Sequence, residues 1–175
     1  MSILENKNTI ITGASRGIGA AAARRFADRG ARVVLAARSA ESIESLAQEI
    51  RDDGGTAMAV PCDVSELGQV QGLVDQTVEK FGGLDVLVNN AGLIAPIARL
   101  ADSAPTEWSR IADIYYKGVY YGMRFAIPAM LQGGGGVIIN VSSGAAVSAL
   151  EGWSHYCSSK AAVLMLTACA HKEYG

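Results

Sequence analysis

The sequence has few cysteines and no long apolar run. Its three cysteines, Cys62, Cys157 and Cys169, form no C-x-x-C pair, which argues against a disulfide scaffold or a zinc knuckle. No apolar run reaches the roughly 18 residues that a membrane span requires. The N-terminus also lacks the charged-then-apolar layout of a signal peptide. These absences predict a cytoplasmic protein with no membrane partner and no metal site.

An excess of one charge is also missing. The chain carries 15 basic and 17 acidic side chains, a formal net charge of -2, so it offers no basic field for a phosphate backbone. We therefore expect no nucleic acid partner. Half of the 175 residues are hydrophobic and 18% are charged, which excludes a disordered tail and fits one globular domain over residues 1–175. The 20 glycines cluster in short runs between apolar segments and indicate turns.

Short apolar runs, several of them β-branched, alternate with helical segments along the chain. We expect strands at 8–12, 32–37, 56–60, 84–88 and 135–141, and helices at 16–29, 39–51, 65–81, 105–131 and 154–174. This alternation requires right-handed crossovers and a parallel sheet with helices on both faces. The predicted fold class is α/β, with three layers and five strands in the order 3-2-1-4-5.

The turn between the first strand and the first helix carries three glycines, Gly13, Gly17 and Gly19, with the spacing G-x-x-x-G-x-G. Such glycines let the backbone approach a pyrophosphate, whose charge is met by unpaired N–H groups at the helix N-terminus. A glycine-rich turn without a ligand is the alternative. We expect the intervening residues of the turn to contact the cofactor as well, namely Ser15, Arg16 and Ile18.

The end of the second strand indicates which dinucleotide binds. A carboxylate about 20 residues after the glycines would accept hydrogen bonds from the adenosine ribose. This chain has no acid there, because Ala37 is followed by Arg38. Arg16 and Arg38 together suit a 2'-phosphate, so NADP(H) is preferred over NAD(H). The alternative is that both are solvated surface arginines.

Polar residues that suit proton transfer follow the last two strands. Tyr156 and Lys160 are four residues apart, so they share one face of the last predicted helix. Ser143 lies thirteen residues before Tyr156, just past the fifth strand. The run Asn89-Asn90-Ala91-Gly92 leaves the fourth strand at the same edge of the sheet, where open α/β sheets bind their ligands.

These elements, T-G-x-x-x-G-x-G, N-N-A-G, a serine and Y-x-x-x-K, occur in an order that strongly resembles the short-chain dehydrogenase/reductase family over essentially the whole chain. The resemblance implies a Rossmann-type, doubly wound sheet. It also implies that Tyr156 is the general acid/base, that Lys160 lowers the pKa of this tyrosine and holds the cofactor ribose, and that Ser143 orients the substrate carbonyl. Further cofactor contacts are implied at Asp63, Val64, Asn89, Ala91 and Gly92.

The chain departs from the family pattern in two places. Tyr115 stands where the family usually carries an asparagine that helps to hold a water next to the lysine. A phenol there either donates its own hydroxyl or blocks the water, and we expect slower turnover rather than its loss. The chain also stops at Gly175, where family members continue with two strands, a helix and a mobile loop. We therefore expect a C-terminally shortened chain whose fifth strand has an open edge.

The predicted function is an NADPH-preferring oxidoreductase that transfers hydride between nicotinamide and a small-molecule carbonyl or secondary alcohol. One alternative is a catalytically impaired protein that still binds NADP. Another is an assembly module, because family members commonly pair through the two long helices, and a homo-oligomer, a dimer or a tetramer, is expected in either case. The sequence does not identify the carbonyl that is reduced.

Overall fold

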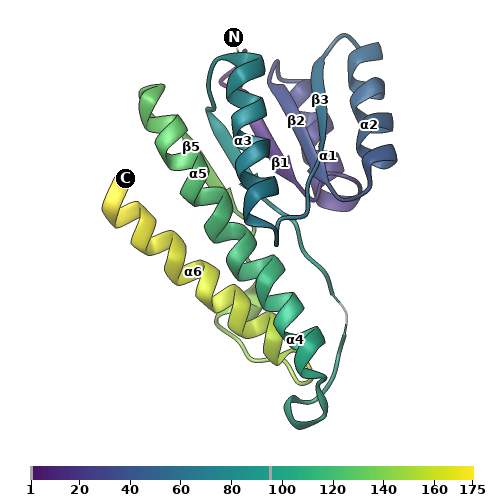
Figure 1. Cartoon of the computed structure of the whole chain (residues 1–175), viewed down its shortest axis with the longest axis vertical. Helices are drawn as coiled ribbons and strands as arrows, with labels where there is room; N and C mark the ends of the chain where they lie inside the picture. Colours follow the sequence, from purple (N-terminus) through teal and green to yellow (C-terminus); the bar gives the residue numbers. More distant parts are fainter. Residues whose placement is uncertain (1, 95) are drawn as a thin grey trace.

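Five runs of aliphatic and β-branched residues form one parallel sheet. In the computed structural model, which describes residues 2–94 and 96–175, the strand order is β3-β2-β1-β4-β5 (Figure 1). The predicted order and the α/β fold class are thereby confirmed. The strands are β1 (Asn8–Thr12), β2 (Arg32–Ala37), β3 (Thr56–Pro61), β4 (Val86–Asn89) and β5 (Val137–Asn140).

Helices connect the strands and cover both faces of the sheet. Among the described residues, no helix is both long and apolar enough to cross a membrane. The α-helices are α1 (Gly17–Ala27), α2 (Ala40–Asp52), α3 (Leu67–Phe81), α4 (Pro105–Ala112), α5 (Gly118–Gln132) and α6 (Ser154–Tyr174). Two short 3₁₀ helices are η1 (Leu100–Asp102) and η3 (Gly144–Ala146), and η2 (Asp113–Lys117) is a π-helical turn.

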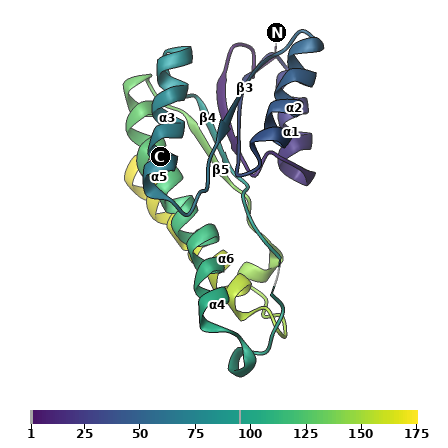
Figure 2. The same cartoon turned by 45° about the vertical axis from the view of Figure 1, so that its right-hand side comes forward.

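Alternate residues of the strands supply two separate cores. Ile11, Leu35 and Val88 pack under α1 and α2 on one face, whereas Ile10 and Leu87 pack under α3 and α5 on the other. Helix α6 runs beside α5 in both views and buries Val163 against it (Figure 2). The two faces share no helix, so the sheet itself fixes the positions of the loops at its ends.

The predicted helix over 105–131 is wrong in one respect, because it is not a continuous α-helix. A π-helical turn, η2, separates α4 from α5, and the backbone N–H of Gly118 donates to the carbonyl of Asp113. The wider turn places both Ile114 and Tyr115 in the interior. A π-helical turn holds one residue more per turn than an α-helix and so changes the directions of the side chains that follow it.

Strand β5 is an edge strand, as the sequence predicts, and it is shorter than the predicted 135–141. Gly134 and Gly135 have φ angles of +90° and +125°, which keeps them out of the strand. Val137 and Ile139 pair with Val86 and Val88 of β4 but remain 57% and 41% exposed. Helices α1 and α2 therefore leave the outer part of this face uncovered.

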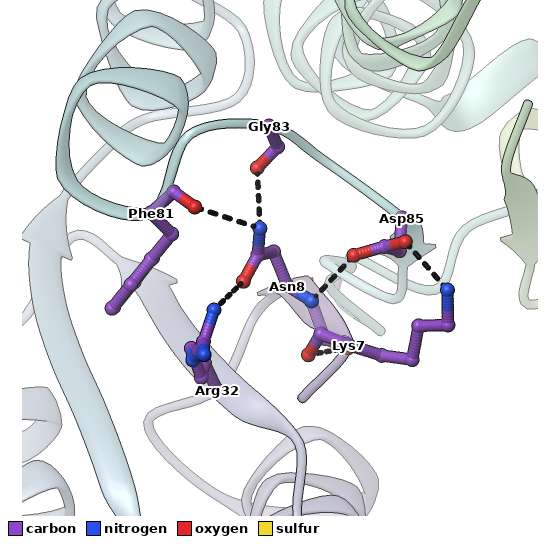
Figure 3. A network of polar contacts seen from close by, with 7 residues as sticks. Lys7, Asn8, Arg32, Phe81, Gly83 and Asp85 are labelled. Atoms are coloured by element: carbon purple, nitrogen blue, oxygen red, sulfur yellow. Dashed lines mark hydrogen bonds and ion pairs between the residues drawn. The ribbon is translucent and has the colours of Figure 1, made fainter. Parts of the chain in front are cut away.

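The end of the sheet opposite its carboxyl edge is held by one buried asparagine (Figure 3). The Asn8 amide nitrogen donates to the carbonyls of Phe81 and Gly83, at 3.3 and 3.0 Å, and the amide oxygen accepts from Arg32 at 3.4 Å. The Asn8 backbone N–H donates to the carboxylate of Asp85 at 2.9 Å. Because these contacts join β1 to β2 and to the α3–β4 loop, Asn8 fixes where β4 enters the sheet.

We expect Asn8→Ala to lower the free energy of unfolding by about 2–3 kcal/mol, because it leaves two partly buried carbonyls without a donor. Urea unfolding followed by circular dichroism measures this change. The control is Lys7→Gln at the same corner, which removes an exposed ion pair to Asp85 and should cost less than about 1 kcal/mol. Equal losses for the two variants would contradict the assigned role of Asn8.

His155, in the first turn of α6, is a second buried polar group. It is 2% exposed, and its Nε2 has no hydrogen-bond partner among the described residues. Burial lowers the pKa of His155 below its usual value, because the charged form is poorly solvated there. The unfolded chain therefore takes up a proton near pH 6.5 that the folded chain resists.

This difference predicts that stability falls as the pH drops through about 6.5, since protons then bind the unfolded state preferentially. His155→Phe should flatten the decline in the free energy of unfolding between pH 7.5 and pH 5.5, as measured by urea unfolding at several pH values. His171 is exposed at the other end of the same helix, so His171→Phe serves as the matched control. A His155→Phe profile parallel to that of the parent chain would refute the assignment.

Candidate active site

The loops that follow four of the strands enclose a cavity of about 930 Å³ at the carboxyl edge of the sheet. This size suits a small-molecule or cofactor site. Ile114 of η2 and the apolar residues Leu93 and Ile94 line it as well. Most of the predicted cofactor residues line the cavity, namely Gly13, Ser15, Arg16, Gly17, Ile18, Arg38, Asp63, Val64, Ala91 and Gly92.

The three glycines of the first loop answer different steric demands. A Cβ at Gly13, whose φ is +66°, would lie 2.8 Å from the Cα of Ala91. A Cβ at Gly19 would lie 2.4 Å from the carbonyl oxygen of Gly13. Gly17, at φ +58°, has no atom within 4 Å of the corresponding position and borders the cavity. The loop is thus closed on its protein side and open toward the cavity.

Asn90, which sequence reasoning passed over, joins this loop to the loop after β4. Its side-chain nitrogen donates to the carbonyl of Thr12 at 2.9 Å. The Thr12 hydroxyl in turn accepts from the backbone N–H groups of Asn90 and Ala91, at 3.0 and 3.1 Å. In the sequence, Asn90 is marked only as the second asparagine of the run 89–92. Its partner Thr12 is distant in the sequence and is brought beside it by the fold.

The predicted cofactor residue Asn89 is buried and points elsewhere. Its side-chain nitrogen donates to the amide oxygen of Asn140 at 2.8 Å, and Asn140 donates to the hydroxyl of Thr167 at 2.9 Å. A Cβ at Gly122 would lie 2.5 Å from the Asn89 oxygen, so α5 also packs closely here. Asn89 does not line the cavity and instead ties β4 to β5 and α6.

Two exposed arginines line the cavity. Arg38 directly follows β2, and Arg16 precedes α1; no carboxylate of the described residues lies within ion-pair distance of either. Burial raises the pKa of the nearby Asp63, but hydrogen bonds from Ser65 and the charges of Arg38 and Arg110 outweigh it and lower the pKa overall. Asp63 is therefore anionic at neutral pH and shapes its own turn.

Cys62 also lines the cavity, although the sequence predicts no role for it there. Burial, together with the charge of Asp63, raises the pKa of this thiol to about 11. It therefore stays protonated and unreactive at neutral pH. Ser39 and Ser42 also line the cavity and were not predicted; their hydroxyls are 2.7 Å apart.

The predicted catalytic residues lie beside this cavity without lining it. Lys160 is 6% exposed, and its Nζ donates to the carbonyl of Val141, which directly follows β5. The same Nζ lies 5.8 Å from the ring centroid of Tyr156. Burial lowers the pKa of Lys160 to about 8. Ser143 precedes η3, which packs against α6, and its hydroxyl accepts from the backbone N–H of Ala145 at 3.2 Å.

Two aromatic rings pack against Tyr156. The ring centroid of Tyr115 lies 5.3 Å away at 78°, and that of Trp153 lies 5.5 Å away at 70°. Both contacts have the edge-to-face geometry that aromatic pairs prefer. The Tyr115 hydroxyl donates to the carbonyl of Leu93 at 2.7 Å, so the phenol at the family's asparagine position uses its hydroxyl in a hydrogen bond to the backbone. Burial, with a smaller contribution from Tyr156, raises the pKa of Tyr115 to about 12.

A second cavity, of about 510 Å³, lies between α1 and α2, away from these residues. The ion pair of Arg24 and Glu49, at 2.6 Å, lies in its wall. None of the predicted site residues lines it. The larger cavity at the carboxyl edge is thus the one in which the predicted residues gather.

Comparison with known proteins shows which family this chain resembles. Residues 7–175 match the short chain dehydrogenase family. The chain is 34% identical over 171 residues to a 2,5-dichloro-2,5-cyclohexadiene-1,4-diol dehydrogenase of Sphingobium indicum, covering 98% of this chain and 68% of that protein. It is 37% identical over 171 residues to the meso-2,3-butanediol dehydrogenase of Serratia marcescens, covering 98% of this chain and 66% of that protein. The chain thus spans about two thirds of the length of these relatives.

Solved structures agree with the sequence relatives. A short-chain type dehydrogenase/reductase from Mycobacterium marinum superposes with a TM-score of 0.90 at 39% identity, over 97% of this chain and 70% of that one. A metagenomic short-chain oxidoreductase in complex with NADP gives 0.92 at 36% identity, over 97% of this chain and 77% of that one. The chain therefore belongs to the short-chain dehydrogenase/reductase family of NAD(P)-dependent oxidoreductases.

Proposed function

We propose that this protein is an NADPH-preferring oxidoreductase that transfers hydride between nicotinamide and a carbonyl or secondary alcohol. The observation that carries the proposal is the buried, positively charged Lys160 one helical turn from Tyr156, beside a cavity that the glycine loop borders. A buried lysine that forms no ion pair is costly in a purely structural role. Its position next to a phenol favours proton transfer as its purpose.

The N-terminus of α1 fits a pyrophosphate. No side chain caps this helix, and its first turn contains no acidic residue. Its first N–H groups are therefore free to bind an anion, which the helix dipole also favours. Gly17 leaves open space toward the cavity at this point, and a side chain there would fill it. These features support binding of the cofactor phosphates by the loop from Gly13 to Gly19.

The NADP preference rests on charge. Arg16 and Arg38 line the cavity without a carboxylate partner, and β2 ends in Ala37 with no acid to accept hydrogen bonds from a ribose. Planar guanidinium groups bind phosphate oxygens in a bidentate manner. That a structural relative was solved with NADP is consistent with this preference. We infer that the two arginines hold the 2'-phosphate.

The remaining chemistry is a proton transfer at the substrate oxygen. The bound nicotinamide supplies the hydride for the carbonyl carbon, or accepts it in the reverse direction. Tyr156 donates its hydroxyl proton to the carbonyl oxygen, which completes the alcohol, and takes a proton from the alcohol when the reaction runs backward. Ser143 donates a hydrogen bond to the same oxygen. Lys160 stabilises the phenolate that Tyr156 becomes and holds the cofactor ribose.

Tyr156→Phe should lower kcat by at least about 100-fold, because general acid–base catalysis typically contributes 10²–10⁴-fold. Cofactor binding should stay within about threefold, since the ring and its contacts with Tyr115 and Trp153 are retained. Turnover is measured from NADPH absorbance with small diketones and 2,3-diols, and binding from NADPH fluorescence. Tyr120→Phe, on the exposed side of α5, is the matched control. Full activity in Tyr156→Phe would rule out this mechanism.

Replacing both Arg16 and Arg38 by Gln should reverse the cofactor preference. Each lost charge-assisted contact is worth about 1.5–3 kcal/mol, so losing both should lower the affinity for NADPH by at least about 100-fold, while that for NADH changes little. Thermal melts with increasing cofactor measure this, because a ligand that binds the folded state raises its stability. Arg25→Gln, at the other end of α1, controls for the loss of positive charge. An unchanged shift with NADPH would contradict the assignment.

A further inference from the structure

Lys160 keeps its charge in a buried place without an acidic partner. Among the described residues it forms no ion pair, and its one hydrogen bond goes to the carbonyl of Val141. A single carbonyl is a small replacement for the hydration that a buried ammonium loses. A further contact that stabilises the ammonium without a carboxylate is therefore significant at this position.

The ring of Tyr115 is in the place to do so. The Nζ of Lys160 lies 4.6 Å from the centroid of this ring, closer than the 5.8 Å to the ring of Tyr156. Attraction between a cation and the face of an aromatic ring acts within about 6 Å and is strongest where water is excluded. Tyr115 is 5% exposed and Lys160 is 6% exposed, so the contact is a desolvated one.

Three features hold the Tyr115 ring in this position. The π-helical turn η2 directs it inward, and its hydroxyl is anchored to the carbonyl of Leu93. The ring also lies against Gly92, where a Cβ would come within 2.5 Å of it. Tyr115 is thus fixed between the loop after β4 and Lys160, which suits it to orient the ammonium of that lysine.

We propose that Tyr115 is a positioning residue, whose ring holds the ammonium of Lys160 toward Tyr156 and so maintains the charge that proton transfer requires. This inference rests on the proposed function. Tyr115 acts through Lys160 and donates no proton to the substrate, because its hydroxyl is committed to Leu93. The ring, and not the hydroxyl, is the part that matters for the lysine.

The experiment follows the protonation of Lys160 directly, in the chain without cofactor, by NMR of ¹³C-labelled lysine side chains. The Lys160 signal is assigned by its loss in Lys160→Met. Tyr115→Phe keeps the ring but loses its anchor to Leu93, so the Lys160 titration and kcat should change by less than they do in Tyr115→Leu. Tyr115→Leu removes the ring, so Lys160 should titrate about one pH unit lower and kcat should fall about tenfold.

Other titratable groups on the elements packed against α6 are common to all variants and cancel in the comparison. Tyr156 and His155 belong to α6 itself. The charged groups of η2 and α4 pair with one another at the surface, Lys117 with Asp113 at 2.7 Å and Arg110 with Glu107 at 3.8 Å. Tyr116→Leu, which removes an exposed ring from the same π-helical turn, is the matched control and should leave both readouts unchanged.

A second series covers the case in which Tyr115→Leu does not fold. Phenylalanines of increasing fluorination at position 115 keep the shape of the ring while weakening the negative charge on its face. The pH at which Lys160 titrates should then fall stepwise with fluorination. An unchanged titration across the series would overturn the inference, as would equal effects of Tyr115→Phe and Tyr115→Leu. Absence of turnover in the parent chain, with the stepwise titration intact, would instead refute the proposed function alone.

Discussion

The site depends on the close approach of two backbone segments, the loop after β1 and the loop after β4. The hydroxyl of Thr12 accepts two backbone N–H groups of the second loop, and Asn90 returns a hydrogen bond to the Thr12 carbonyl. Neither contact is possible unless the position after Thr12 lacks a side chain, because a Cβ at Gly13 would meet the Cα of Ala91. The parallel pairing of β1 with β4 brings the two loops to the same edge, and glycine allows them to touch.

The same constraint extends from the cavity to α6. The loop that Asn90 fixes continues into Gly92 and Leu93, which together accommodate the ring and the hydroxyl of Tyr115. Tyr115 in turn contacts both Tyr156 and Lys160. The glycine loop and the residues proposed for proton transfer are therefore linked by contacts through Tyr115, although the loops and α6 are distant in sequence.

The sequence was sufficient to predict the elements whose cause is local. Apolar runs such as the one from Ile10 to Thr12 and the glycine spacing of the first loop determine the strands, the sheet order and the cavity edge. The π-helical turn has no local signal, because no residue type or spacing in the sequence from Asp113 to Lys117 distinguishes it from an α-helical turn. The direction of Asn89 was equally inaccessible, since its partner Asn140 is brought beside it only by the pairing of β4 with β5.

The positive charges of the candidate site lie in two different environments, since Arg16 and Arg38 are exposed and Lys160 is buried. Arg16 and Arg38 are exposed, so water already solvates them, and under the proposed function a doubly charged phosphate would have to compete with that water. Lys160 is buried without a carboxylate, so its field is weakly screened and is not neutralised. An acidic partner would stabilise the lysine but would also cancel its effect on Tyr156. An aromatic ring stabilises the ammonium without adding a negative charge, so under the proposed function a ring suits a lysine that stabilises a neighbouring phenolate better than a carboxylate does.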